Sequence, residues 1–92
     1  MAQAVVTLKI MPESPSVDIE SLAQRALKEV LDFNGNKETR IAIEPIAFGL
    51  KAVNITFVMD EAKGSPDVLA DRIALLDDVN SAQIVDVRRA IG

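Results

Sequence analysis

The chain has 92 residues, of which 49% are hydrophobic and 26% are charged, and its formal net charge is −4. This length provides for one domain with one compact core, and it excludes a multidomain protein. The acidic balance disfavours direct binding to nucleic acid or to an anionic membrane, because both depend on clustered Lys and Arg.

Cysteine and histidine are both absent from the sequence. Without cysteine there is no disulfide, no thiolate nucleophile and no Cys-based metal site. Without histidine the commonest general base and metal ligand is missing. No apolar segment has the length of a signal peptide core or a membrane span. We therefore expect a cytoplasmic protein that is not an enzyme and holds no metal or cofactor.

The first half of the chain predicts a strand followed by a helix. Apolar and polar residues alternate over residues 4–10, which indicates a strand that the proline-rich turn at 11–16 ends. Over residues 19–31, apolar side chains recur at steps of three and four, as in an amphipathic helix. Asp18 is the expected N-cap of this helix and Gly35 its left-handed C-cap.

The second half predicts two strands, a shorter helix and a last strand. A strand around residues 40–44 stops at Pro45, and another covers about residues 50–59. Ser65 is the expected N-cap of the second helix and Pro66 its first residue, and the apolar stripe ends near residues 77–78. Residues 82–87 predict the last strand.

The predicted order is therefore β-α-β-β-α-β within one domain spanning residues 1–92. Right-handed connections around a single core make this an α+β, ferredoxin-like sandwich. We expect a four-stranded antiparallel sheet of order 4-1-3-2 with two helices on one face. This topology places the turn at 11–16 beside the hairpin tip at 45–49, at one end of the sheet. The turn at 63–64 and the basic residues near the C-terminus share the other end.

The hairpin over residues 45–51 is apolar at a place where turns are usually polar. Exposed Ile46, Phe48 and Leu50 would be costly unless a partner covers them. The alternative is that Phe48 folds back under the sheet. Lys51 has the parity of the core side of its strand, so it lies beyond the helices at the end of the sheet or extends its amine to water.

Arg88 and Arg89 form an adjacent basic pair near the end of an acidic chain. Such a pair is either a solvated strand end or a contact for an anion or for acids on a partner. The acidic pairs at 60–61 and 77–78 lack the spacing of a calcium loop, and we interpret them as solvated turn residues. The serines have no base that would activate them.

Three segments resemble the archaeal form of translation elongation factor 1-beta. They cover residues 9–20, 44–52 and 85–89, and the similarity extends over essentially the whole chain. The stretch Pro-Ile-x-Phe-Gly-hydrophobic-Lys, here residues 45–51, is also similar to the catalytic C-terminal domain of the eukaryotic relatives.

The resemblance implies a guanine-nucleotide exchange factor for the GTPase elongation factor 1-alpha, which acts in peptide-chain elongation. It also implies a ferredoxin-like fold and places the hairpin aromatic, here Phe48, at the partner interface. Eukaryotic members direct a lysine near the C-terminus toward the magnesium site of the GTPase. That lysine would align near Gly92, so its role does not carry over, and the arginine pair is our own candidate. The predicted partner-binding residues are Phe48, Lys51, Ile46, Leu50, Arg88 and Arg89.

A protein of a different class would also fit the topology, namely a small regulatory or oligomerisation module that binds a small ligand. That reading predicts self-association or ligand binding and no effect on a GTPase. The exchange-factor reading predicts a monomer that contacts its partner through both ends of the sheet.

Overall fold

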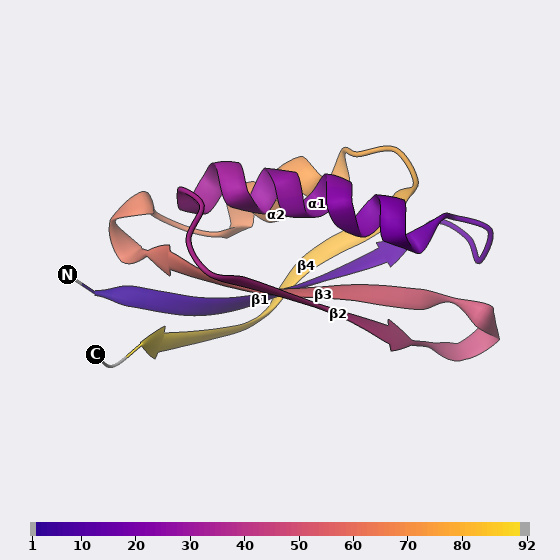
Figure 1. Cartoon of the computed structure of the whole chain (residues 1–92), viewed down its shortest axis with the longest axis horizontal. Coiled ribbons are helices and arrows are strands. Elements are labelled where there is room, and N and C mark those ends of the chain that lie inside the picture. Colours follow the sequence, from indigo (N-terminus) through magenta and orange to yellow (C-terminus); the bar gives the residue numbers. More distant parts are fainter. Residues whose placement is uncertain (1, 91–92) are drawn as a thin grey trace.

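A computed structural model describes the backbone of residues 2–90 and the side chains of residues 2–89. Its regular elements are β1 (Gln3–Pro12), α1 (Ile19–Asn34), β2 (Thr39–Pro45), β3 (Lys51–Asp60), α2 (Asp67–Ala74) and β4 (Val79–Ala90). All paired strands are antiparallel, and the sheet order is β2-β3-β1-β4, which is the predicted order 4-1-3-2 counted from the other edge. Both helices lie on one face of the sheet (Figure 1). The α+β ferredoxin-like sandwich is therefore confirmed.

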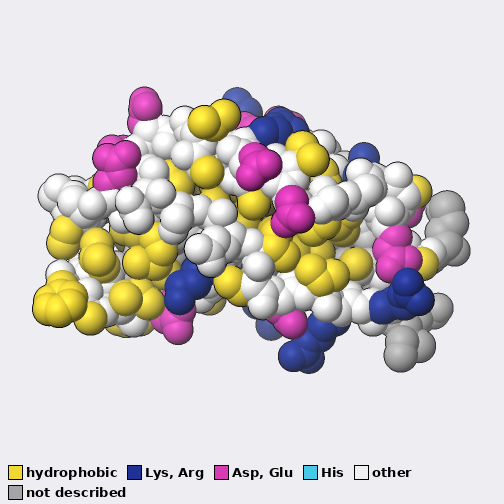
Figure 2. Space-filling model, turned by 180° about the vertical axis from the view of Figure 1, so that it is seen from behind, with side chains coloured by type: hydrophobic (Ala, Val, Ile, Leu, Met, Phe, Trp, Pro, Cys, Tyr) yellow, Lys and Arg dark blue, Asp and Glu magenta, His cyan; other side chains and the backbone are white. Residues whose placement is uncertain are grey.

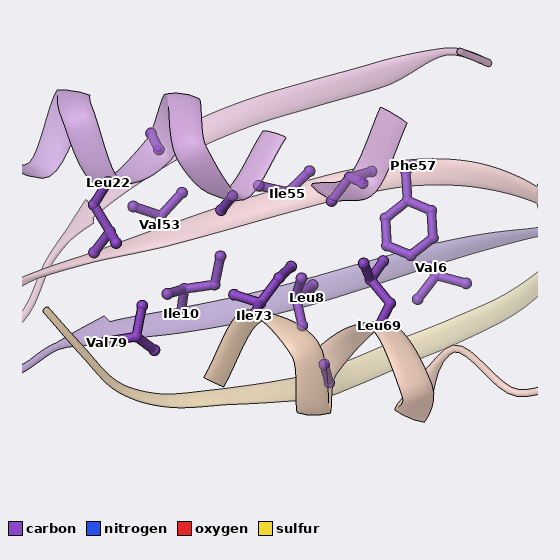
Figure 3. Close-up of a cluster of buried hydrophobic side chains, with 14 of the residues drawn as sticks. Val6, Leu8, Ile10, Leu22, Val53, Ile55, Phe57, Leu69, Ile73 and Val79 are labelled. Atoms are coloured by element: carbon purple, nitrogen blue, oxygen red, sulfur yellow. The ribbon is translucent and has the colours of Figure 1, made fainter. Parts of the chain in front are cut away.

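The hydrophobic core lies between the two helices and the inner face of the central strands β1 and β3. The period-two alternation predicted for both strands is present, because every second side chain is buried from residue 4 to 10 and from residue 53 to 59. The core side chains labelled in Figure 3 are Val6, Leu8, Ile10, Val53, Ile55, Phe57 and Val79 from the strands and Leu22, Leu69 and Ile73 from the helices.

The predicted signals for α1 are confirmed at both of its ends. The Asp18 carboxylate accepts a hydrogen bond from the Ser21 N–H at 3.2 Å, and Gly35 has a φ of 71°. The α2 signals are confirmed only in part. Ser65 is the predicted N-cap and Pro66 the predicted first residue, but the helix begins at Asp67 and Pro66 takes the cap position, while the Ser65 Oγ accepts from the Asp67 N–H at 3.2 Å. The last residue of α2 is Ala74, earlier than predicted, because the Leu75 and Leu76 N–H groups bond to carbonyls only three residues back and so tighten the chain into a turn.

Strands β1 and β4 extend further at each of their ends than the sequence predicted. β1 continues through Pro12. Its pairing with β3 ends at Ile10, so Pro12 pairs with β4 alone. At that position the missing proline N–H costs the sheet no central hydrogen bond. β4 spans Val79–Ala90 instead of residues 82–87, since pairing with β1 holds both of its ends.

The Asn34 side chain is fully buried and connects the end of α1 to β3. Its amide nitrogen donates to the Val58 carbonyl at 3.0 Å, and its oxygen accepts from the Lys37 N–H at 3.2 Å. Asn34→Ala removes a fully buried side chain and takes away the hydrogen-bond partner of two part-buried backbone groups, so we expect a free energy of unfolding lower by about 2 kcal/mol. Urea denaturation measures this loss. Asn80→Ala, at an exposed position of β4, is the control and should change the value by less than about 0.5 kcal/mol.

Candidate functional site

The structure divides the six predicted partner-binding residues between the two ends of the sheet (Figure 1). The β1–α1 turn and the β2–β3 hairpin share one end, where a Cβ added to Gly49 would lie 3.8 Å from that of Pro15. The β3–α2 turn and both chain termini share the other end. We call Ile46, Phe48, Leu50 and Lys51 the hairpin surface and Arg88 with Arg89 the arginine pair. The predicted neighbours at each end are confirmed, whereas the partner-binding role of these residues stays a prediction.

Phe48 projects from the hairpin tip with 93% of its surface exposed, so it does not fold back under the sheet. Its φ of +62° lies in the left-handed region, which costs a residue other than glycine about 1–2 kcal/mol. The turn around it is closed by the Ile46 N–H, which donates to the Leu50 carbonyl at 2.7 Å. The tip therefore holds an aromatic ring in water at a cost in backbone energy.

The other two apolar residues of the hairpin surface, Ile46 and Leu50, are half-buried, whereas Phe48 is exposed. Ile46 and Leu50 flank the turn instead of occupying its tip, so Phe48 supplies most of the apolar area that the tip offers. Figure 2 shows hydrophobic side chains gathered at this end of the molecule, on its left, and basic side chains toward the opposite end.

The strained backbone at Phe48 leads to a testable result for the stability of the free protein. Asparagine tolerates the left-handed region much better than phenylalanine. Phe48→Asn should therefore raise the free energy of unfolding by about 0.5–1 kcal/mol, since the lost side chain makes little contact with the protein. Urea denaturation measures the effect. The control is Ala47→Asn, at the neighbouring position, which does not have a positive φ. A decrease in stability would show that the ring does contribute to the fold.

Lys51 is the first residue of β3, at the end of the sheet, and its exposure is compatible with both of the predicted alternatives. It is exposed and lines an open hollow together with Ser14 and Pro15 of the β1–α1 turn and Gly49 of the hairpin. Sequence patterns pointed to Lys51 through its strand parity. The predicted topology places the turn at 11–16 beside the hairpin, but it does not single out Ser14 or Pro15 as residues that line a hollow with Lys51.

Each member of the arginine pair makes an ion pair with an acid of this chain. The Arg88 Nε donates to the Asp86 carboxylate at 2.9 Å, and the Arg89 Nε donates to the Glu61 carboxylate at 3.2 Å. Both arginine side chains remain more than 70% exposed. Glu61 lies in the β3–α2 turn, as interpreted from the sequence, and this turn also brings it beside β4, where it makes a surface ion pair.

The two arginines lie on opposite faces of the sheet. The pairing of β4 with β1 has two register shifts, and the one between Thr7 and Leu8 indicates a bulge near Val85. Beyond the bulge, Arg89 pairs with Ala4, a residue of the inner face, so Arg88 belongs to the open face. The pair does not form one cationic patch.

A metal-binding cluster and a membrane-spanning helix each place a simple requirement on the described residues. Between residues 2 and 90, His, Cys, Asp and Glu side chains nowhere gather in threes that could hold a metal ion. Neither helix in the described part is long and apolar enough to cross a membrane.

Comparison with known proteins finds similarity over nearly the whole chain. Residues 5–90 match the family model described as the EF-1 guanine nucleotide exchange domain. Elongation factor 1-beta of Methanobrevibacter smithii is 42% identical over 92 residues, and that of Methanosphaera stadtmanae is 39% identical over 89 residues. In both cases the similarity covers 97% of this chain and 98% of the relative. The de novo designed protein Foldit4 has the same fold, with a TM-score of 0.63, 20% identity and 98% of each chain covered.

Proposed function

Because this chain belongs to the family of the EF-1 guanine nucleotide exchange domain, we propose that it promotes the release of GDP, and so its exchange for GTP, on elongation factor 1-alpha. The match of residues 5–90 to that domain is the observation that carries the proposal. In this account the chain is a single exchange domain that acts as a monomer in the cytoplasm during peptide-chain elongation. It makes and breaks no covalent bond.

The proposed activity needs only a difference in binding energy. Mg²⁺ bridges the phosphates of a bound nucleotide and neutralises their charge. A factor that binds the nucleotide-free GTPase more tightly than the GDP complex must weaken GDP binding by the same ratio. Lowering the barrier to release by roughly 4 kcal/mol would accelerate it about a thousandfold.

The shape of the molecule supports a contact with the GTPase at two separate places. Its longest dimension is 42 Å, against 21 and 17 Å for the other two. The hairpin surface and the arginine pair lie at opposite ends of this long sheet. We propose that the hairpin surface anchors one domain of the GTPase while the arginine pair disturbs its nucleotide pocket.

Release of fluorescent GDP from purified elongation factor 1-alpha tests the proposed function directly. We expect the release rate to rise and then saturate as the 92-residue protein is titrated in. Gel filtration of the two proteins should show a complex, while this chain alone should elute as a monomer. An unchanged release rate, with self-association of this chain, would favour the regulatory or oligomerisation module instead.

A further inference from the structure

The hollow beside the hairpin has an open volume of about 160 Å³, several times that of a water molecule. Lys51 from β3 and Ser14 from the β1–α1 turn supply polar side chains to its wall. Pro15 and Gly49 close it where the turn meets the hairpin. We call this hollow the Lys51 socket.

The charges around the Lys51 socket favour an anionic guest. No acidic side chain lines it, and Lys51 has no carboxylate within 4.0 Å among the residues that the structure describes. Asp18 and Glu13 are sequence neighbours of wall residues without being part of the wall: the Asp18 carboxylate is held by the Ser21 N–H as a helix cap, and Glu13 is exposed. An unpaired ammonium in a concave wall is complementary to a negative group that enters from outside.

Ser14 can add a hydrogen bond to such a guest. Its Oγ accepts from the Ser16 N–H at 3.3 Å and lies 2.8 Å from the Ser16 Oγ. When the Ser16 hydroxyl donates across that short contact, the Ser14 proton can turn toward the guest. The socket then offers one ammonium and one hydroxyl donor, which suits the two oxygens of a carboxylate.

We propose that the Lys51 socket receives an aspartate or glutamate side chain of elongation factor 1-alpha, next to the place where Phe48 contacts that protein. This inference rests on the proposed function. A carboxylate fits better than a nucleic-acid phosphate, because the chain has a net charge of −4 and Lys51 is the one cation in the socket wall within the described part of the chain. Phe48 is only three residues away, so a surface that accepts its ring also comes close to the socket.

Charge substitutions at Lys51, followed by GDP release, test this proposal. Lys51→Gln should lower the exchange efficiency, measured at low factor concentration, about tenfold, and Lys51→Glu about a hundredfold. Lys51→Arg should retain most of the activity. The control is Lys28→Glu on the exposed face of α1, which makes the same change in net charge and should stay within about twofold of the unsubstituted protein.

Charge reversal on the GTPase identifies the guest. Changing its surface Asp and Glu residues to Lys one at a time should reveal one variant that restores exchange by Lys51→Glu. If Lys51→Gln and Lys51→Glu lose equal activity, or if Lys51→Glu behaves as Lys28→Glu does, the carboxylate contact is overturned while the exchange function stands. If the unsubstituted protein does not accelerate GDP release, the proposed function itself is overturned.

Discussion

Phe48→Ala should raise the concentration of this protein needed for half-maximal GDP release from elongation factor 1-alpha by roughly a hundredfold. An exposed aromatic side chain that enters a partner pocket typically contributes about 3 kcal/mol to binding, which corresponds to that factor. Phe48 suits such a role, since 93% of its surface is exposed and its backbone is held in the left-handed region. The maximal rate at saturating factor should change little, because an anchor far from the nucleotide stabilises the GTPase complexes with and without GDP alike.

A matched control is Val68→Ala, which truncates another exposed apolar side chain at the start of α2. Both kinetic parameters should stay within about twofold of the unsubstituted values. If Phe48→Ala keeps the half-saturating concentration of the unsubstituted protein, the hairpin surface is not part of the interface with the GTPase. A reduced maximal rate at unchanged half-saturation would instead place Phe48 near the nucleotide.

The fold could be predicted from the sequence because its decisive signals are local. In β1 and β3 every second residue is apolar, and that pattern alone indicates which face of each strand is buried. Asp18 and Gly35 mark the ends of α1 through chemistry that acts within one helical turn. The limits of β4 could not be predicted in this way, because residues 79–81 and 88–90 break the alternation and are held by pairing with β1.

The candidate site was less predictable because it depends on tertiary geometry. The exposure of Phe48 depends on the conformation of the turn, in which its own φ is positive. Phenylalanine as a residue type gives no indication of that angle. As neighbours in a strand, Arg88 and Arg89 must lie on opposite faces, but the bulge near Val85 decides which of them shares the inner face, and nothing in the neighbouring side chains signals that bulge. Glu61 meets Arg89 across 28 positions of sequence, so only the folded sheet reveals their contact.

Replacing both arginines of the pair with alanine should lower the maximal rate of GDP release about thirtyfold. Each guanidinium uses its Nε for the ion pair within this chain, which leaves its terminal N–H groups for a partner. If these groups contact the GTPase more strongly when GDP is absent, their loss raises the release barrier by about 2 kcal/mol, which gives the stated factor. Stopped-flow release at saturating factor measures it, and the half-saturating concentration should change far less than in Phe48→Ala.

The control for this double substitution removes two other exposed arginines, with Arg40→Ala and Arg72→Ala combined. The lost charge is the same, and Arg72 also gives up a surface ion pair, its contact with Glu29. Surface ion pairs contribute about 0–1 kcal/mol each, so both double variants should remain folded. Because Arg88 and Arg89 lie on opposite faces of the sheet, the single substitutions should divide the effect unequally, and the larger loss identifies the face turned toward the nucleotide pocket. A maximal rate equal to that of the control would mean that the C-terminal end binds the GTPase no more strongly once GDP has left, and that exchange is driven from elsewhere on the sheet.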